Sequence, residues 1–304
     1  MIKPRRHPEK IMNPPVKFSV VVPACGRPGQ LAQCLARLAP GAQTWPVADY
    51  EVIVTDDSAD DSVQSLVQAQ FRWAQWAAGP RRGPAANRNS GARRAKYDWL
   101  AFTDDDCLPE PGWLAAFGAQ LQAVGEAAPD LLEGRTYADR PQRSLAERAP
   151  INTNGGYLWS CNLAVRRELF ERLGGFDEGF PYASMEDVDL AMRLRASGAR
   201  EIFVPLAGVC HPWREIAGFG AMWTAEQKHL ASVRYFLAKH PEERSHHTPL
   251  AYFKNNARQL VRSTLPGLCR WRGRGFPAAL AWHLHTLRKP LALRRPGVEA
   301  AGSP

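Results

Sequence analysis

Short apolar runs alternate with amphipathic segments over the first two thirds of the chain. Apolar runs that end at Pro, Gly or Asp are typical of buried strands, and apolar residues three and four positions apart are typical of helices. The pattern predicts strands at 18–23, 50–55, 99–103, 131–137, 160–165 and 202–205, and helices at 31–38, 62–71 and 186–196. Strand, loop and helix in repeated order indicate βαβ units, hence an α/β fold with a mainly parallel sheet.

The last third of the chain has a different character. It reads as one long helix, 216–239, followed by one or two helices over 251–289 that Pro266 and nearby Gly and Pro residues interrupt. The charge changes at the same place, because residues 1–212 carry a net charge of −1 and residues 213–304 a net charge of +10, with no Asp. We therefore expect a basic N-terminal arm at 1–17, an α/β domain at 18–213 and a basic helical extension at 214–304.

Composition excludes several classes of protein. The 304 residues are 45% hydrophobic, which suits a globular protein and not a disordered one. No apolar run is long enough to span a bilayer, and no apolar segment follows the basic residues of the N-terminus, so we expect neither a spanning helix nor a signal peptide. Six scattered cysteines without a C-x-x-C pair imply neither a zinc site nor a disulfide framework. A reducing cytoplasm is the expected compartment.

Carboxylates follow two of the predicted strands. Asp104, Asp105 and Asp106 come after strand 99–103, and the Asp56-Asp57-Ser58 turn follows strand 50–55. Ligands of open α/β sheets bind where strands end in this way. Three adjacent carboxylates call for a compensating cation, and Mg²⁺ or Mn²⁺ prefers such oxygen ligands and bridges them to a diphosphate. The alternatives are a solvated acidic turn or the cap of a following helix.

A third acidic group opens the helix predicted at 186–196. Asp187 has the helical phase of Leu190 and Leu194, so it lies on or beside the inward face and is a candidate general base. Glu186 falls on a more polar stripe. Asp189 lies four positions before Arg193 and is expected to form an ordinary surface ion pair with it.

Two further segments carry polar chemistry. The sequence Asn87-Arg88-Asn89-Ser-Gly offers a guanidinium and amides near a helix N-terminus, which suits an anion, although a capped surface helix has the same pattern. His211 follows the last predicted strand and precedes a proline that would fix its loop. It is either a ligand or a packed residue.

Taken together, six segments resemble a family 2 glycosyltransferase of the GT-A fold, over about residues 17–213. They are Val20-Val-Val-Pro-Ala24 with Arg27, Val52-Ile-Val-Thr-Asp-Asp-Ser58, Ala86-Asn-Arg-Asn-Ser-Gly91, Phe102-Thr-Asp-Asp-Asp-Cys-Leu-Pro109, Leu173-Gly-Gly-Phe-Asp-Glu178 and Glu186-Asp-Val-Asp-Leu-Ala-Met-Arg193. The resemblance implies a Rossmann-like sheet and the inverting, metal-assisted transfer of a sugar from a nucleoside-diphosphate donor to an acceptor hydroxyl. Such enzymes commonly build cell-surface glycans or glycolipids. The Gln-x-x-Arg-Trp element of processive members is missing, so single transfers are expected.

The resemblance also assigns roles to residues. It places the nucleotide sugar against Pro23, Ala24, Arg27, Asp57, Arg88, Asp104 and Asp105. It places Mg²⁺ or Mn²⁺ on Asp106 with His211 as a further ligand. It makes Asp187, of the Glu186-Asp187 pair, the base that deprotonates the acceptor.

Two other classes of function remain open at this point. A sugar-phosphate nucleotidylyltransferase has a similar sheet, but it needs a Gly-rich basic loop after its first strand, which Ala24-Cys-Gly-Arg-Pro-Gly imitates poorly, and it has no use for Glu186-Asp187. A non-enzymatic nucleic-acid binder is suggested by the isoelectric point of about 9.5 and by aromatic residues among the basic ones. No nucleic-acid motif is present, so no nucleic-acid partner is expected.

The basic extension suggests an anionic membrane surface as a partner. Apolar residues recur at helical spacing at Phe253, Ala257, Leu260, Val261, Leu265 and Leu268, and again at Phe276, Leu280, Trp282, Leu284 and Leu287. Basic residues flank both stripes, a pattern typical of helices that lie in the headgroup layer. We expect a protein peripheral to the inner face of the cell membrane, acting on a glycan or lipid-linked acceptor. In the alternative, the apolar stripes pack on the α/β domain.

Overall fold

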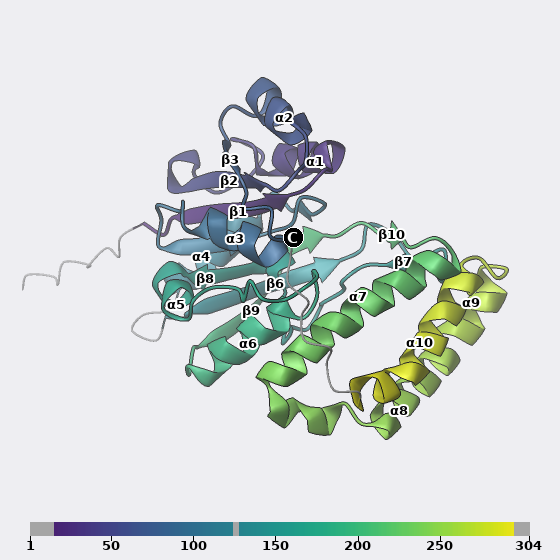
Figure 1. Ribbon diagram of the computed structural model, residues 1–304. Coiled ribbons are helices and arrows are strands. Elements are labelled where there is room, and N and C mark those ends of the chain that lie inside the picture. The colour runs from purple at the N-terminus through teal and green to yellow at the C-terminus, as the bar shows by residue number, and fades with distance from the viewer. Residues whose placement is uncertain (1–14, 124–127, 295–304) are drawn as a thin grey trace, which may run out of the picture.

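The computed structural model describes residues 15–123 and 128–294, so most of the arm expected at 1–17 lies outside the described residues. An eight-stranded sheet forms its centre (Figure 1). Its strands are β1 (Phe18–Ala24), β2 (Tyr50–Asp56), β3 (Gln75–Ala78), β4 (Trp99–Phe102), β5 (Leu108–Pro109), β6 (Leu131–Tyr137), β8 (Leu163–Arg166) and β9 (Glu201–Cys210). A separate ribbon pairs β7 (Glu147–Arg148) with β10 (Arg214–Glu215).

The strand order is β3-β2-β1-β4-β8-β6-β9-β5. The pairs β3–β2, β2–β1, β1–β4 and β6–β9 are parallel, and β8 runs antiparallel to both of its neighbours. The expected mainly parallel sheet is therefore confirmed. Because β1, β2, β4 and β9 run in one direction, their carboxyl ends lie at one edge of the sheet.

Helices cover both faces of the sheet. They are α1 (Pro28–Leu38), α2 (Ser62–Gln70), α3 (Pro84–Ala92), α4 (Trp113–Ala123), α5 (Arg167–Arg172) and α6 (Glu186–Ala196). Successive residues of a strand point to opposite faces. Val20 and Val22 accordingly pack with apolar residues of α1, α2 and α4, whereas Val21 packs with those of α3, α5 and α6. β1 is buried on both sides, which explains its continuous apolar run.

Every strand and helix expected before residue 210 is present, with shifts at the ends. The segment 160–165 begins as a 3-10 turn before β8, and the short strand expected at 202–205 is the ten-residue β9. β3 was not expected from the pattern, because this edge strand is only partly buried and has little apolar signal.

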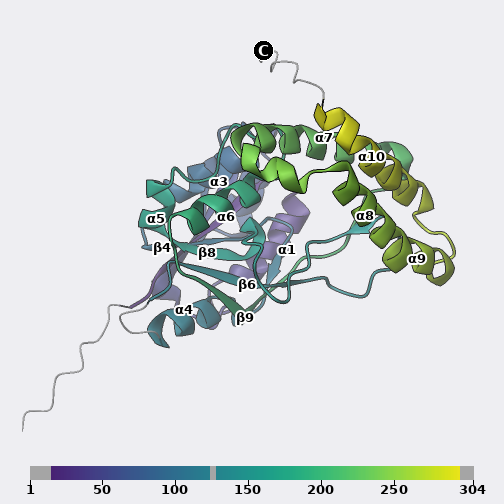
Figure 2. The ribbon, with the colours of Figure 1, turned by 90° about the horizontal axis from the view of Figure 1, so that it is seen from below.

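The remaining helices form a group beside the sheet (Figures 1 and 2). α7 (Gly218–Lys239) matches the long helix expected from the sequence. α8 (Pro249–Gln259) continues through a π-helical turn, Leu260–Thr264, into α9 (Leu265–Arg270). Pro266 lies in the first turn of α9 and does not end the helical segment, contrary to the expectation. After a turn, α10 (Phe276–Arg294) packs against both α7 and α8. No helix of the described residues is long and apolar enough to cross a membrane.

Candidate active site

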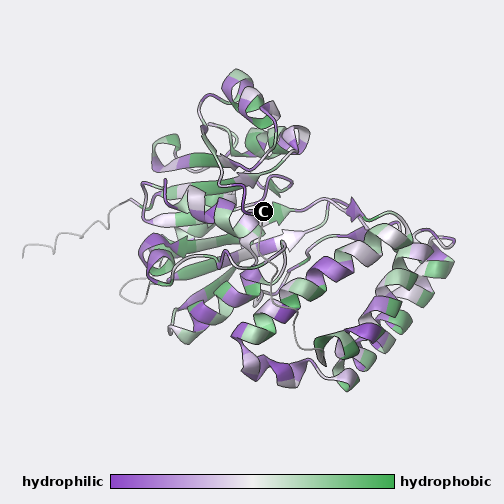
Figure 3. Cartoon of the chain, viewed as in Figure 1, coloured by the Kyte–Doolittle hydropathy of each residue, from purple (hydrophilic) through white to green (hydrophobic). Residues whose placement is uncertain are grey.

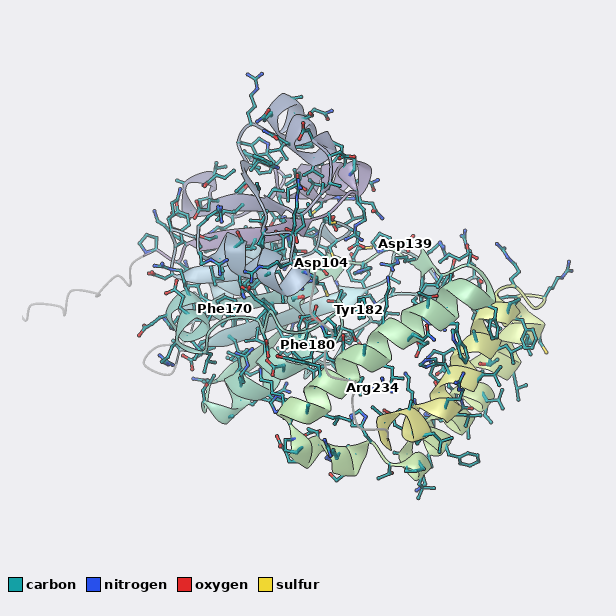
Figure 4. All side chains as sticks on the ribbon, in the orientation of Figure 1. Asp104, Asp139, Phe170, Phe180, Tyr182 and Arg234 are labelled. Atoms are coloured by element: carbon teal, nitrogen blue, oxygen red, sulfur yellow. The ribbon has the colours of Figure 1, made fainter. Side chains whose placement is uncertain are left out.

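The carboxyl ends of β1, β2, β4 and β9 surround a cavity of about 270 Å³. Figure 4 shows Asp104 at this edge, with Tyr182 between it and α7. Residues singled out from the sequence that line the cavity are Pro23, Ala24, Arg27, Asp57, Arg88, Asp104, Asp106 and His211. The other lining residues are Cys25, Gly83, Pro84, Asn87, Ala183 and Arg214. Asn87 belongs to the polar segment 87–91 that the sequence singled out as suited to an anion, whereas no role was expected for Cys25, Ala183 or Arg214.

Arg27, the last residue before α1, neutralises two of the three adjacent aspartates. Its guanidinium donates to Asp106 Oδ2 at 2.7 Å and to Asp105 Oδ2 at 3.2 Å. Charge-assisted hydrogen bonds of this kind are among the strong ones. The acidic turn is therefore compensated in part by the protein itself, and not by a metal ion alone.

The structure places Asp105 differently from the role that the resemblance implied. Its side chain is fully buried, it does not line the cavity, and it accepts hydrogen bonds from Arg27 and from the backbone N–H of Cys25. Burial raises the pKa of Asp105 to about 7, although Arg27 opposes the shift. Asp105 thus positions Arg27 and the loop after β1 without lining the cavity itself.

Arg88 links the aspartate turn to α6. The helix that carries it, α3, is buried over most of its length, so the alternative of a capped surface helix is wrong. The guanidinium donates to Asp104 Oδ1 at 2.7 Å and to Glu186 Oε1 at 3.3 Å. Burial disfavours the charge of Arg88, but these neighbouring carboxylates outweigh it and raise its pKa. Burial likewise opposes ionisation of Asp104, and Arg88 nevertheless holds its pKa below the usual value.

Glu186 and Asp187 open α6 behind a strained residue. Met185 adopts a left-handed conformation with φ of 74°, which costs free energy for a residue with a side chain. Contrary to the expected polar position, Glu186 is buried and Asp187 only half-buried. One oxygen of each, Glu186 Oε2 and Asp187 Oδ1, is buried without a hydrogen-bond partner. Neither residue lines the 270 Å³ cavity directly.

Their environment shifts the ionisation of both carboxyls in the same direction. Burial, followed by the charge of Asp187, raises the pKa of Glu186 to about 7. Burial also raises the pKa of Asp187, against the opposing effect of Arg88. A carboxyl pair with unpartnered oxygens and raised pKa values is suited to accept a proton.

Asp189 is not the surface ion pair expected from its spacing. It does bond Arg193, at 2.8 Å from Nε to Oδ2, but its side chain is fully buried. Its other oxygen lies 2.7 Å from Lys239 Nζ and 2.8 Å from His240 Nε2, at the end of α7. These contacts span about fifty residues of sequence, so helical spacing on α6 alone does not predict them. Asp189 therefore joins the end of α7 to α6.

Asp106 and His211 form a candidate divalent-cation site. His211 Nδ1 donates to the carbonyl of Pro212 at 3.2 Å, which leaves the Nε2 lone pair facing Asp106 Oδ1, 3.6 Å away. Cys107 Sγ lies within 4.8 Å of both ligand atoms. Burial raises the pKa of the Cys107 thiol well above its usual value. A sulfur ligand is also softer than the oxygen ligands that Mg²⁺ and Mn²⁺ prefer. One carboxylate oxygen and one imidazole nitrogen suit Mn²⁺ or Mg²⁺ with further ligands from a bound diphosphate.

Asn87 and Asp57 shape the cavity wall between β1 and β2. Asn87 Nδ2 donates to the carbonyls of Ala24 and Thr55, at 3.2 and 3.0 Å, and so ties the ends of the two strands together. Asp57 Oδ1 accepts the backbone N–H of Arg81 at 2.8 Å. Burial raises the pKa of Asp57. Asp57 lines the cavity together with Asn87.

Comparison with known proteins agrees with this architecture. Residues 19–174 match the sequence model described as glycosyl transferase family 2. The chain is 35% identical over 146 residues to a pre-mycofactocin glycosyltransferase of Mycobacterium tuberculosis, covering 44% of this chain and 31% of that protein. It is 27% identical over 274 residues to a validoxylamine A glucosyltransferase of Streptomyces hygroscopicus subsp. jinggangensis, covering 74% and 61%. The matches thus span less than two thirds of these relatives.

Solved structures are similar in fold. A mannosyltransferase from Pyrobaculum calidifontis, in complex with GDP-Man and Mn²⁺, superposes with a TM-score of 0.58 at 19% identity, over 92% of this chain and 88% of that one. Residues 1–349 of TarS from S. aureus, in complex with UDP-GlcNAc, superpose with a TM-score of 0.52 at 19% identity, over 91% and 84%. At this low sequence identity, the superpositions show a common fold alone, the GT-A type.

Proposed function

Because the chain belongs to glycosyltransferase family 2 and is a glycosyltransferase, we propose that its cavity binds a nucleoside-diphosphate sugar. We propose further that the sugar moves to an acceptor hydroxyl with inversion, in single transfers. The family assignment separates the protein from nucleotidylyltransferases and from nucleic-acid binders. The single observation that carries the donor proposal is the convergence of eight of the expected residues on one cavity.

The donor half of the reaction has its groups along the cavity wall. Pro23, Ala24 and Asp57 would hold the base, with the Asp57 carboxylate accepting hydrogen bonds from it. Arg27 and Arg88 would face the diphosphate end, and Asp104 the ribose. Arg27 and Arg88 are already fixed by carboxylates, so they would lose little conformational freedom when a donor binds.

The acceptor half would use the carboxyl pair at the start of α6. In a single displacement the acceptor oxygen attacks the anomeric carbon as the bond to the diphosphate breaks, and the configuration inverts. We propose that Asp187 takes the acceptor proton on its unpartnered Oδ1. Glu186 is more buried and is bonded to Arg88, so its role would be to position Arg88 and to keep the pKa of the pair raised.

Asp106 Oδ1 and His211 Nε2 would hold Mg²⁺ or Mn²⁺. Such a cation offsets negative charge on the diphosphate leaving group. The structural relative from Pyrobaculum calidifontis binds Mn²⁺ together with GDP-Man, which supports a divalent ion here. Arg27 occupies only the other oxygen of Asp106, so its ion pair leaves Oδ1 available.

A cytoplasmic enzyme peripheral to the membrane would fit the charge of the chain. Residues 213–304 carry a net charge of +10. We propose that the acceptor is a glycan or a lipid-linked molecule of cell-surface synthesis, which an anionic membrane surface would concentrate near the enzyme.

Thermal unfolding with a panel of ligands tests the donor proposal. A ligand that binds only the folded state raises the melting temperature by mass action. We expect one nucleoside diphosphate and its sugar, among UDP, GDP and their common sugars, to raise it in the presence of Mn²⁺ and less in EDTA. If no nucleotide shifts the melting temperature with Mn²⁺ while nucleic acid does, the cavity is not a donor site.

A further inference from the structure

Helices α8–α10 expose an apolar surface on the side that does not pack on α7. More than half of the large apolar side chains exposed in the described residues belong to this group. Phe253 and Val261 are 61% and 63% exposed, and Leu291 is 68% exposed. The alternative that the apolar stripes pack on the α/β domain is therefore wrong for Phe253, Val261 and Leu291. Figure 3 shows apolar residues recurring along α8, α9 and α10.

The apolar positions of α10 form a stripe distinct from its packed face. Ala278 and Ala281 are buried against Met222 of α7. Leu280, Leu284, Leu287 and Leu291 recur at three- and four-residue spacing and are exposed. The packed face of α10 therefore includes Ala278, Ala281 and His285, whereas these four leucines remain on the surface.

The stripes of α8 and α10 join into one surface. A cavity of about 460 Å³ lies between the two helices, and its lining is apolar apart from the Tyr252 hydroxyl. Phe253 from α8 and Leu287 and Leu291 from α10 all line it. We name eight exposed apolar residues of α8, the π-helical turn, α9 and α10 the apolar face, namely Leu250, Phe253, Val261, Leu265, Leu280, Leu284, Leu287 and Leu291.

Basic residues run beside the apolar face. Lys254, Arg258 and Arg262 are exposed and four residues apart, each next in sequence to an apolar position. Residues 249–294 contain nine Lys or Arg and no Asp or Glu. Among the eight of these at 254–289, whose side chains the structure describes, only Lys289 forms an ion pair, with Glu226 at 2.8 Å. The occupant of this surface is therefore apolar where it meets the leucines and anionic around them.

We propose that the apolar face, with Lys254, Arg258 and Arg262 at its edge, seats the enzyme in the headgroup layer of an anionic lipid bilayer. An apolar stripe flanked by Lys and Arg matches a helix lying parallel to that layer. Insertion would be shallow, since no helix of the described residues can span the membrane. Only the purpose of this docking, access to a lipid-linked acceptor, rests on the proposed function.

Flotation with vesicles tests the proposal on the full chain. Vesicles of phosphatidylcholine with phosphatidylglycerol are compared with pure phosphatidylcholine at low and high salt. Each basic residue near an anionic surface strengthens binding about fivefold. The triple variant Lys254→Gln, Arg258→Gln, Arg262→Gln is therefore expected to lose about a hundredfold in partition onto anionic vesicles. Phe253→Ser with Leu287→Ser and Leu291→Ser is expected to weaken binding to both vesicle types.

Matched controls separate the surface from unspecific effects. Arg72→Gln removes an exposed cation and Leu206→Ser an exposed leucine, both outside the helical group, and neither should change flotation. Nucleotide-induced thermal shifts of all variants should match the wild type, so a failed docking proposal would leave the donor proposal standing.

Two outcomes would overturn the proposal. One is equal flotation of the wild type and both triple variants on anionic vesicles. The other is a dimer, seen by light scattering, that the Phe253, Leu287 and Leu291 substitutions convert to monomer without any effect on flotation. In that case the apolar face is an interface between two copies of the chain.

Discussion

Cations serve opposite purposes at the sheet edge and in helices α8–α10. At the sheet edge, Arg27 and Arg88 each contact two carboxylates, and Arg88 is buried. On α8 and in the π-helical turn, Arg258 and Arg262 are exposed, and neither has a carboxylate within ion-pair distance among the described residues. The cations at the sheet edge are paired with carboxylates of the protein, whereas those of the helical group face the solvent.

This difference determines what each region can recognise. Guanidiniums paired with carboxylates have fixed positions, which suits a small ligand with a defined geometry such as a diphosphate. Exposed lysines and arginines without partners have no fixed geometry and suit a diffuse anionic surface. Substitutions at the two places should accordingly differ in size and kind.

The largest contrast is expected in stability. Arg88→Met leaves Asp104 and Glu186 buried without their cation, and removing one partner of a buried pair costs about 3–5 kcal/mol. Arg258→Gln removes an exposed charge and should change the free energy of unfolding by less than about 0.5 kcal/mol. Urea denaturation of both variants measures the contrast. Equal losses would mean that the pairing around Arg88 contributes little.

Asp187→Asn should affect turnover more than binding. Loss of a positioned base lowers kcat by at least about a hundredfold, whereas the melting-temperature shift by the donor should be preserved. Glu168→Gln, an exposed carboxylate of α5, is the matched control and should retain the kcat of the wild type. If Glu186→Gln is the inactive variant and Asp187→Asn is active, the base has been assigned to the wrong carboxylate.

Asp106→Asn should weaken metal-dependent donor binding. The amide cannot offer a charged ligand and also loses its ion pair with Arg27. We expect at least about a tenfold rise in the donor Kd with Mn²⁺, and little change in EDTA, measured by calorimetry. An unchanged Kd in Mn²⁺ would remove Asp106 from the cation site.

The pH dependence of kcat is expected to change less than stability, turnover and donor binding do in the variants above. Burial raises the pKa values of Glu186 and Asp187, the former to about 7, so a larger fraction of the pair is protonated and inactive as the pH falls. We expect the acid limb of kcat, where the rate falls roughly tenfold per pH unit, to lie at higher pH than an ordinary aspartate would give. Glu186→Gln removes the neighbouring carboxyl and should move this limb to lower pH. An acid limb at the usual pKa of an aspartate, about 3.9, would contradict a base with a raised pKa.

Local sequence patterns predicted the sheet and most of the residues that line the cavity at its edge. Strands such as β1 and β2 are buried on both sides, and the residues that follow them reach one edge because parallel strands impose it. Cys25, in the loop after β1, and Arg214, in the short strand β10, reach the cavity through the folding of the chain, and no local sequence pattern indicates it. The same holds for Asp189, whose partners come from α7.

Burial of charged groups was the hardest property to infer. Helical phase placed Asp187 inward and Glu186 outward, yet Glu186 is the more buried, because Arg88 from α3 reaches it across the sheet edge. Asp105 was expected in the cavity and lies behind it, since Arg27 covers it. In α8–α10 the periodicity showed an apolar stripe, but only the three-dimensional packing shows that the stripe is exposed.

Anomer-resolved turnover of a nucleotide sugar tests the central claim most directly. The enzyme is incubated with Mn²⁺ and the α-linked donor selected by thermal shift, with water as the acceptor, and released sugar is followed by proton NMR before mutarotation. We predict a nucleoside diphosphate and a sugar that appears first as the β-anomer, with both lost in EDTA and in Asp187→Asn. Release of the α-anomer first, or equal release in EDTA, would contradict an inverting, metal-assisted glycosyltransferase.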